Sequence, residues 1–378
     1  SRLRLLRTNL PATFRHGPEA LEKHHPFCYL LRPSFKIHTT REHKMSDLGI
    51  GIVGYGKVGA GAHRNWAANT DGAKLVAVCD GTDVRQAAAA EENPGISIYE
   101  NLGDMLADDS VVLVIVTTPP SSHCELAVQA LEAGKHVFVD KPFAMTKAEA
   151  EQMLDAAEQA GKVIHCHQSR RYDGEYRAIV KAVSDGKIGE VQHVRRIWSQ
   201  YGEGWASWGI EGFNPTWRIQ RAYGGGMVYD YAPHCGDQIL RLVDKPLHSV
   251  FADARGIKFS DEVDDHFSCM MRFGGGATAY LECSNMTTLS APHWYVIGTE
   301  GSLSSAGVNK PVELKRGESD EIETLEPIRE IDELYTNVIA SCRGEATPLV
   351  TADQLRASMG LIDAIFQSSQ IGEMVMVR

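Results

Sequence analysis

Short apolar runs alternate with amphipathic stretches of helical length over residues 45–168. The runs occupy residues 48–53, 74–79, 111–116, 136–140 and 163–167. The run at 111–116 is apolar at every position, which is typical of a strand buried on both faces in the middle of a parallel sheet. Such alternation indicates parallel strands joined by crossover helices. We therefore predict a doubly wound α/β domain of the Rossmann type over residues 45–168.

Two helix starts in this first domain are marked by hydroxyl residues. Ser122-x-x-Glu125 and Thr146-x-x-Glu149 both have the spacing of a capping box, in which the two side chains bond free backbone N–H groups. The sequence therefore predicts a capped helix after each of the two hydroxyl residues.

The pattern changes beyond residue 168, after a helix expected at 175–184. Phe267–Phe273 and Ala277–Cys283 are strand-like and are separated by three glycines, which predicts an antiparallel hairpin. We expect residues 169–350 to form an α+β domain with a large, mainly antiparallel open sheet. Residues 351–378, opened by Thr351-Ala-Asp353, should add a helix and tail that pack back near the domain boundary.

The second domain also raises two expectations about its surface. An open sheet needs one face covered, so we expect a homodimer or homotetramer formed through this sheet. The loop from Gly202 to Pro215 contains Trp205 and Trp208 and is the segment we expect to cover a substrate.

Residues 1–44 differ in composition from the rest of the chain. They carry nine Lys or Arg against three Asp or Glu, a charge of +6, so the remainder of a chain with net charge −11 carries −17. Such an acidic body argues against nucleic acid as a partner. Because Met45 stands just before the first strand, we interpret residues 1–44 as a disordered or non-native extension. A targeting arm or a nucleic-acid-binding tail is the alternative.

The cysteines indicate where the protein is located in the cell, and the histidines bear on whether it binds a metal. The eight cysteines include no Cys-x-x-Cys pair, which suits free thiols in a reducing compartment and predicts a cytoplasmic protein. No run of 18 or more apolar residues is present, so no membrane span is expected. Four histidines follow no metal-ligand spacing, and we interpret them as core or loop residues and expect no metal: His165, His167, His266 and His293.

The first apolar run leads directly into Gly54-x-Gly56-x-x-Gly59. Gly54 permits a tight turn, Gly56 lets backbone amides approach a pyrophosphate, and Gly59 lets the next helix pack closely on the sheet. The helix N-terminus favours the negative phosphates. This motif predicts a dinucleotide site, and we expect Lys57 and Val58 to contact the cofactor as well.

Asp80 ends the second apolar run, 21 positions after Gly59. A carboxylate at this place accepts hydrogen bonds from ribose hydroxyls. It also repels a 2′-phosphate, so the sequence favours NAD over NADP. The alternative is that Asp80 caps a turn before Gly81.

Two further segments follow predicted parallel strands, at the edge of the sheet where ligands bind. Thr117-Thr-Pro-Pro-Ser-Ser-His123 contains two prolines, which stiffen a loop that either lies against the cofactor or is a rigid turn. Asp140-Lys141-Pro142 places a lysine near the nicotinamide half of a bound cofactor. Its ammonium can hydrogen-bond a substrate hydroxyl and stabilise the developing alkoxide. The alternative for Lys141 is an ion pair with Asp140 or another carboxylate.

A third segment, Gly224-Gly-Gly-Met-Val-Tyr-Asp230-Tyr-Ala-Pro-His234, combines flexible backbone with two titratable side chains. If a helix begins near Val228, Asp230 and His234 are four residues apart and share a face. Histidine is a proton acceptor near neutral pH, and a carboxylate one turn away can orient its ring. The glycine run would permit close approach of a ligand. The alternative is a surface pair.

Together these segments resemble the glucose-fructose oxidoreductase/inositol dehydrogenase/rhizopine catabolism (Gfo/Idh/MocA) family, over nearly everything from Met45 to Val377. The resemblance implies that Lys141, Asp230 and His234 are catalytic and that the glycine loop and Asp80 bind NAD(P). The remaining cofactor contacts that we expect are Thr117, Pro119, Pro120, His123, Asp140, Pro142 and Gln168.

This chain differs from the family at one motif position, and the role of four other family-like residues has an alternative. Asp140 stands where the family more often has glutamate, so we expect a contact on the cofactor side to shift while the role of the lysine is kept. Arg171, Tyr172, Trp217 and Arg218 resemble family positions that line the substrate or cofactor site. Packing at the domain boundary is the alternative for these four.

These observations lead us to expect an NAD-dependent oxidoreductase that acts on a secondary alcohol of a sugar, cyclitol or glycoside. His234 would accept the hydroxyl proton, Lys141 would stabilise the anion, and Asp230 would orient His234. One alternative is a tightly bound NAD(H) that is recycled internally to give 3-keto sugars or glycosides. Another is a non-catalytic, NAD-sensing regulatory protein of the same fold.

Overall fold

The computed structural model describes residues 47–202, 209–329 and 333–377. The expected extension at residues 1–44 lies outside these ranges, as do Trp205 and Trp208 of the expected substrate-covering loop. Among the helices of the described residues, none combines the length and apolar character that a bilayer crossing requires. Seven cysteines fall within the described ranges, and all seven are free thiols.

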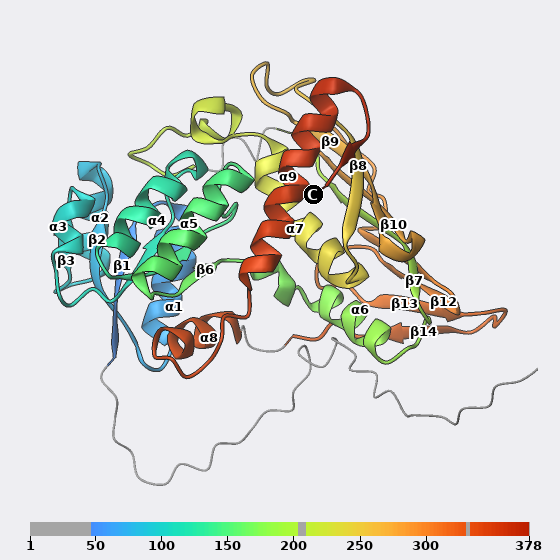
Figure 1. Ribbon diagram of the computed structural model, residues 1–378, viewed down its shortest axis with the longest axis horizontal. Helices are drawn as coiled ribbons and strands as arrows, with labels where there is room; N and C mark the ends of the chain where they lie inside the picture. Colours follow the sequence, from blue (N-terminus) through green and yellow to red (C-terminus); the bar gives the residue numbers. More distant parts are fainter. Residues whose placement is uncertain (1–46, 203–208, 330–332, 378) are drawn as a thin grey trace, which may run out of the picture. The chain divides into compact units, whose positions relative to one another are not determined.

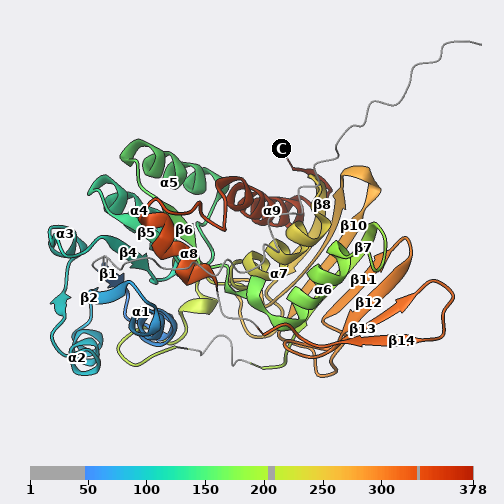
Figure 2. The same cartoon turned by 90° about the horizontal axis from the view of Figure 1, so that it is seen from below.

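The first half of the described chain forms a six-stranded parallel sheet with helices on both faces. Its elements are β1 (Leu48–Val53), η2 (Gly59–His63), α1 (Arg64–Asn69), β2 (Ala73–Cys79), α2 (Asp83–Glu92), β3 (Ser97–Tyr99), α3 (Leu102–Leu106), β4 (Leu113–Val116), η3 (Pro120–Ser122), α4 (His123–Glu132), β5 (His136–Val139), α5 (Lys147–Ala160) and β6 (Ile164–Cys166). The strand order is β3-β2-β1-β4-β5-β6 (Figure 1). Helices α4 and α5 lie on one face and α1 on the other (Figure 2). The predicted doubly wound α/β fold is therefore confirmed.

The central strands explain why this sheet forms. Every residue of β1 and β4 is buried, as their uninterrupted apolar sequences predict. The strand order runs outward from β1 in both directions, so a crevice opens at the carboxyl ends of β1 and β4, where ligands of open α/β sheets bind.

The second half of the described chain builds a nine-stranded sheet. Its elements are η4 (Ser169–Tyr172), α6 (Gly174–Ser184), β7 (Val191–Ser199), η6 (Trp217–Ile219), η7 (Arg221–Tyr223), α7 (Met227–Val243), β8 (Leu247–Arg255), β9 (His266–Phe273), η8 (Gly274–Gly276), β10 (Thr278–Ser284), β11 (Trp294–Gly298), β12 (Gly301–Ser305), β13 (Val312–Arg316), β14 (Ile322–Leu325), α8 (Glu333–Cys342), α9 (Ala352–Ile371) and β15 (Val375–Met376). The order is β14-β13-β12-β11-β7-β10-β9-β8-β15, and only the β7–β10 pair is parallel. Helices α6, α7 and α9 lie along one face of this sheet (Figure 2). The expected hairpin is present as β9 and β10.

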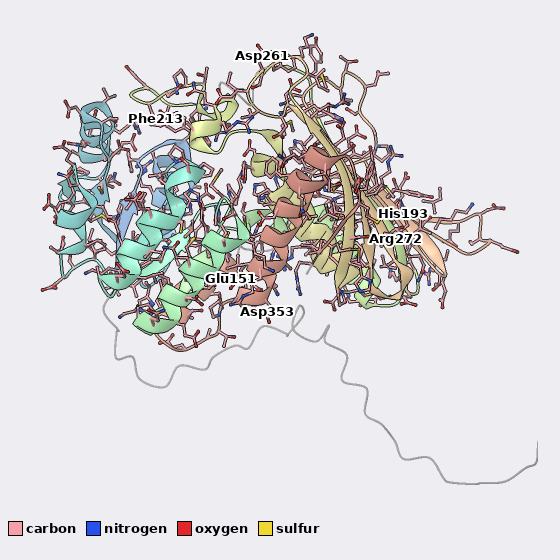
Figure 3. All side chains as sticks on the ribbon, turned by 45° about the horizontal axis from the view of Figure 1, so that its top comes forward. Glu151, His193, Phe213, Asp261, Arg272 and Asp353 are labelled. Atoms are coloured by element: carbon pink, nitrogen blue, oxygen red, sulfur yellow. The ribbon has the colours of Figure 1, made fainter. Side chains whose placement is uncertain are left out.

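Helix α9 connects the two halves through its packing. It lies against α5 of the first half and against α7 and β8 of the second. Figure 3 shows Glu151 of α5 close to Asp353 of α9. Arg356 bridges them, with its Nε 2.8 Å from Glu151 Oε2 and its Nη1 3.1 Å from Asp353 Oδ1. Because these side chains are exposed, the pairs add little stability, and the apolar face of α9 supplies most of the attachment.

The predicted capping boxes have different outcomes. Thr146 accepts a hydrogen bond from Glu149 N, as predicted, although the Glu149 carboxylate accepts from Met145 N. The prediction for Ser122 is wrong, because its hydroxyl donates to Thr118 Oγ1 at 2.7 Å and to Pro119 O at 2.9 Å. The two prolines before α4 form a short 3-10 turn, and this turn takes the hydroxyl that would otherwise cap the helix.

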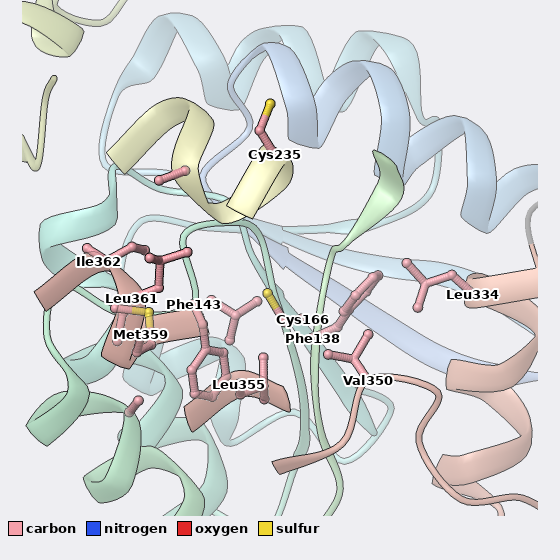
Figure 4. Packing of buried hydrophobic residues seen from close by; sticks show 14 of the residues in the cluster. Phe138, Phe143, Cys166, Cys235, Leu334, Val350, Leu355, Met359, Leu361 and Ile362 are labelled. Carbon is pink, nitrogen blue, oxygen red and sulfur yellow. The ribbon is translucent and has the colours of Figure 1, made fainter. Parts of the chain in front are cut away.

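Aromatic and imidazole rings surround Phe138 on one face of the first sheet. His63, at the end of η2, lies edge-on to Phe138, with ring centroids 5.4 Å apart. Trp66 stacks on Tyr335 of α8 at 4.1 Å, and Figure 4 shows Leu334 and Val350 beside Phe138. His63 is completely buried, and neither of its ring nitrogens has a partner among the described residues. Burial lowers the pKa of His63 to about 3, so the ring is neutral at physiological pH.

This buried histidine makes folding sensitive to acid. The unfolded chain takes up a proton at an ordinary histidine pKa of 6.5, whereas folded His63 does not until about 3, so stability falls as pH drops below 6.5. His63→Leu should reduce the loss of unfolding free energy between pH 7 and pH 5 by about 2 kcal/mol. Chemical denaturation at the two pH values measures this loss. His248→Leu is the control, because His248 is exposed. If His63→Leu loses as much unfolding free energy between pH 7 and pH 5 as the wild type, His63 is not the histidine responsible.

Candidate active site

A cavity of about 960 Å³ lies at the carboxyl ends of the first sheet's strands and reaches the start of α7. This volume falls in the range of small-molecule and cofactor sites. Fifteen of the residues that the sequence singled out line this one cavity: Gly54, Gly56, Lys57, Val58, Asp80, Thr117, Pro119, Pro120, Asp140, Lys141, Pro142, Trp217, Arg218, Asp230 and His234.

The glycine loop forms one end of the cavity. Gly54 has a φ of 84°, which favours glycine, and its N–H donates to Cys79 O. Beyond its two chain neighbours, no described residue has an atom within 4 Å of the position that a Cβ on Gly56 would take, so the backbone there is open to the cavity. A Cβ on Gly59 would lie 2.5 Å from Gly54 O, so this glycine lies beneath the loop and does not line the cavity. The three positions thus have the separate geometries that a pyrophosphate-binding turn requires.

Asp80 both holds the glycine loop and faces the cavity. Its Oδ2 accepts from Tyr55 N at 2.8 Å, and its Oδ1 accepts from the backbone and hydroxyl of Thr82 at 3.0 and 2.9 Å. The turn-capping alternative is therefore part of its role. The carboxylate also lines the cavity, where it remains within reach of a ligand hydroxyl.

His123 and Gln168 do not line the cavity, which corrects two predicted cofactor contacts. The two ring nitrogens of His123 each lie 2.8 Å from a carbonyl oxygen, one of Pro142 and one of Thr118. His123 thereby ties together two loops that do line the cavity. Gln168 is buried, and the turn into η4 places it in the interior.

Arg171 and Tyr172 also do not line the cavity, contrary to the prediction. The Arg171 guanidinium donates to both carboxylate oxygens of Asp237, at 2.7 and 2.6 Å, and Tyr172 packs against the hydrophobic core. Ser169 and Arg170 of the same tight turn face the cavity instead. Because successive residues of such a turn point in different directions, the prediction identified the right segment and the wrong side chains.

Lys141 and Asp230 form the ion pair at the centre of the cavity's other end. The Lys141 ammonium donates to Asp230 O at 2.8 Å and to its Oδ1. Arg218 Nε lies 3.7 Å from Asp230 Oδ2. Burial raises the pKa of the Asp230 carboxyl, but the charges of Lys141 and Arg218 outweigh this and hold it below its usual value. Asp230 is therefore an anion that faces two cations.

His234 lies on the same helix but is not paired with Asp230. It is 9% exposed, and its Nδ1 is buried without a hydrogen-bond partner among the described residues. The expectation that Asp230 orients His234 is thus not met, because the two cations attract the carboxylate instead. Burial, followed by the charge of Lys141, lowers the pKa of His234 well below its usual value, so the ring is neutral and can accept a proton.

The triple glycine before α7 lines the cavity, as the expected close approach of a ligand requires, and it also permits close protein packing. A Cβ on Gly225 would lie 2.4 Å from Arg218 O, and one on Gly226 would lie 2.5 Å from Asp264 Oδ1. Val228 N donates to the same Asp264 carboxylate at 2.7 Å, which satisfies the start of α7. The glycines therefore let the segment that carries Arg218 lie directly on the start of α7.

His167 was interpreted as a core or loop histidine, yet it lines the cavity. Its Nδ1 lies 3.0 Å from Asp140 Oδ1 and its Nε2 lies 3.1 Å from the Tyr335 hydroxyl. The departure from glutamate at position 140 was the only signal in the sequence that this neighbourhood differs. Other lining side chains that sequence reasoning missed are Arg170, Gln200, Tyr229 and Tyr231.

Comparison with known proteins agrees with this geometry. Residues 48–168 match the description "Oxidoreductase family, NAD-binding Rossmann fold", and residues 176–304 match "GFO/IDH/MocA C-terminal domain". An NAD-binding protein from Listeria innocua is 32% identical, with a TM-score of 0.78 over 88% of this chain and 97% of that one.

Two sequence relatives are enzymes by name. The chain is 28% identical to a 1,5-anhydro-D-fructose reductase from Ensifer adhaerens, over 84% of this chain and 97% of the relative. It is 30% identical to an uncharacterized oxidoreductase from Schizosaccharomyces pombe, where the match spans 59% of this chain and 61% of the relative's length. With both domains matched in order and the cavity between the strand ends and α7, the chain belongs to the Gfo/Idh/MocA oxidoreductase family.

Proposed function

We propose that the protein oxidises, or in reverse forms, a secondary alcohol of a sugar, cyclitol or glycoside, with NAD as the hydride acceptor. The observation that carries the proposal is that Lys141 and His234 line the same cavity as the open glycine loop. An ammonium, a neutral imidazole and a dinucleotide cradle in one cavity are the parts that alcohol oxidation needs.

The described residues fit a dinucleotide. The backbone at Gly56 leaves free the space that a Cβ would fill, and the Asp80 carboxylate faces the same end of the cavity. Asp80 would accept from ribose hydroxyls and repel a 2′-phosphate, which supports NAD over NADP. When bound, the cofactor supplies the acceptor for the hydride.

Proton transfer is the part of the reaction that this chain performs. His234 is neutral because burial and the charge of Lys141 lower its pKa, so its ring is free to take the hydroxyl proton, and the Lys141 ammonium favours this transfer by lowering the pKa of the hydroxyl itself. The Lys141 ammonium donates two hydrogen bonds to Asp230 and has a third N–H available for the substrate oxygen. As the oxygen becomes an anion, that positive charge stabilises it without any movement of the protein. Asp230 holds Lys141 in place rather than orienting His234.

The outer face of the second sheet supports association with another copy of the chain. Register pairs Phe251 with Met270, Met270 with Tyr280, and Arg195 with both Tyr280 and Tyr295. Phe251, Met270 and Tyr295 of this row are 47%, 42% and 42% exposed. A row of large exposed side chains on a sheet face suits a self-complementary contact, so we infer a homodimer or homotetramer.

The free thiols are the basis for inferring a cytoplasmic location.

The glycine loop provides a test of cofactor binding. Gly56→Ala should leave the thermal unfolding midpoint unchanged, because, apart from the adjoining residues of the chain, no atom of the described residues lies within 4 Å of the added carbon. It should weaken NAD binding roughly 10-fold or more, because the methyl group occupies the pyrophosphate's space. Titration calorimetry measures the affinity. Gly61→Ala, which is equally unhindered and does not line the cavity, is the control. Wild-type NAD affinity in Gly56→Ala would refute the cradle.

The proposed chemistry is tested at Lys141. Lys141→Met should keep NAD affinity and lower turnover by roughly 10²-fold or more, the scale for loss of a positioned electrostatic group. Turnover is followed as cofactor reduction with a panel of inositols, aldoses and glycosides. Lys181→Met is the control, because Lys181 is exposed and pairs with Asp185 on the surface. Unchanged turnover in Lys141→Met would remove Lys141 from the mechanism.

The sheet face is tested by placing a charge on it. Phe251→Glu should convert the oligomer to a smaller species, because burying an unpaired carboxylate in the contact is unfavourable. Light scattering after size-exclusion chromatography measures the mass. Ile371→Glu is the control, since Ile371 is also about half exposed but ends α9 on the opposite side of the sheet. A wild-type monomer, or an unchanged mass in Phe251→Glu, would exclude this interface.

A further inference from the structure

His167 joins three parts of the chain at the inner wall of the cavity. It follows β6, and its Nδ1 lies 3.0 Å from Oδ1 of Asp140, which follows β5. Its Nε2 lies 3.1 Å from the hydroxyl of Tyr335 on α8. All three side chains are largely enclosed, with His167 and Tyr335 each 8% exposed. Both ring nitrogens of a cavity-lining histidine are thus held by protein groups.

The partners determine which nitrogen carries the proton. Burial raises the pKa of the Asp140 carboxyl, but the hydrogen bond from His167 and the charge of Lys141 outweigh it and hold the pKa well below its usual value. An ionised carboxylate only accepts, so Nδ1 must donate to it. Nε2 lies within hydrogen-bond distance of the Tyr335 hydroxyl, which can donate to it or accept from it. The network therefore places a proton on Nδ1 and holds the imidazole by both nitrogens.

Two rings packed against His167, those of His63 and Phe138, are uncharged at physiological pH. The His63 ring lies 4.7 Å away by centroids, and its burial keeps it neutral. Phe138 lies 5.7 Å away, edge-on to the imidazole. His63, Asp140 and His167 offer nitrogen and oxygen atoms within 4.8 Å of one another, a spacing that a metal ion could also use. The hydrogen bonds already account for Asp140 and for both nitrogens of His167, so we treat the group as a hydrogen-bonded network.

Asp140 precedes Lys141 in the chain, so its carboxylate is a second anion beside the catalytic ammonium. Asp140, Lys141 and Asp230 all line the same cavity, and the charge of Lys141 helps to lower the pKa of the Asp140 carboxyl. An Asp140 carboxylate without another partner would compete with Asp230 for the ammonium. Lys141 would then be drawn away from Asp230 and from the substrate oxygen.

We propose that His167 is a positioning residue for Lys141: by binding the Asp140 carboxylate, it leaves the ammonium to Asp230 and the substrate. Tyr335 holds Nε2 and so fixes the orientation of the ring that makes this possible. The proposal rests on the proposed function, because it assigns a role within the same site. It also explains how an aspartate can stand beside this lysine, since the shorter side chain reaches a donor from the neighbouring strand end.

The test combines loss, conservative replacement and rescue. His167→Leu should lower kcat on the order of 10²-fold, the scale of a misplaced catalytic group, with little change in KM for NAD. His167→Asn, whose amide can donate from the position of Nδ1, should recover most of that loss. The double variant His167→Leu/Asp140→Asn should also be much faster than His167→Leu, because the competing charge is gone. A purely structural role predicts no such rescue, so a double variant as slow as the single one would overturn the proposal.

A crystal structure of His167→Leu tests the same idea without turnover. The Asp140 carboxylate should rotate into hydrogen-bond distance of Lys141 Nζ, and an unmoved Asp140 would overturn the proposal. Failure of the wild-type protein to oxidise any polyol defeats the proposed function but leaves this structural readout intact.

Metal analysis of purified wild-type protein tests whether His63, Asp140 and His167 bind a metal ion instead. One equivalent of a divalent ion that is lost in His63→Leu would replace the hydrogen-bonded network with a metal site and overturn the positioning role.

Discussion

The ion pair between Lys141 and Asp230 is the contact on which the site depends. The two residues are 89 positions apart, one at the end of β5 and the other in the first turn of α7. Their side chains are 18% and 20% exposed, so the attraction is stronger than on an open surface, while the cost of desolvation offsets much of it. The pair is therefore better understood as fixing the position of an ammonium than as adding stability to the fold.

The charged side chains around the Lys141–Asp230 pair nearly cancel one another. Lys141 and Arg218 are the cations nearest to Asp230, and Asp140 is held by His167 on the other side. Such a nearly neutral arrangement suits an uncharged polyol, since a substrate oxygen can gain negative charge beside Lys141 without a counter-ion entering. His234, kept neutral by burial, completes the arrangement as the group with a free position for a proton.

Local patterns predicted the backbone well and the side-chain partners less well. The glycine motif, the buried strands and the β9–β10 hairpin depend on short-range sequence, and each is present. The pairing of Asp230 with His234 was inferred from helical spacing alone, and the cations that capture Asp230 come from segments remote in sequence. Arg171 was predicted and Arg170 was missed, because a sequence does not show which way a tight turn faces. The side-chain pairs that tertiary packing brings together could therefore not be predicted from the sequence.

The central claim is that one cavity brings the reacting end of a dinucleotide to Lys141 and His234. A crystal structure of the protein with NAD tests it most directly. The account predicts the pyrophosphate at Gly56, the adenosine ribose at Asp80 and the nicotinamide ring in contact with Lys141 and His234. A nicotinamide ring that points away from both side chains, or a dinucleotide bound outside this cavity, would contradict it.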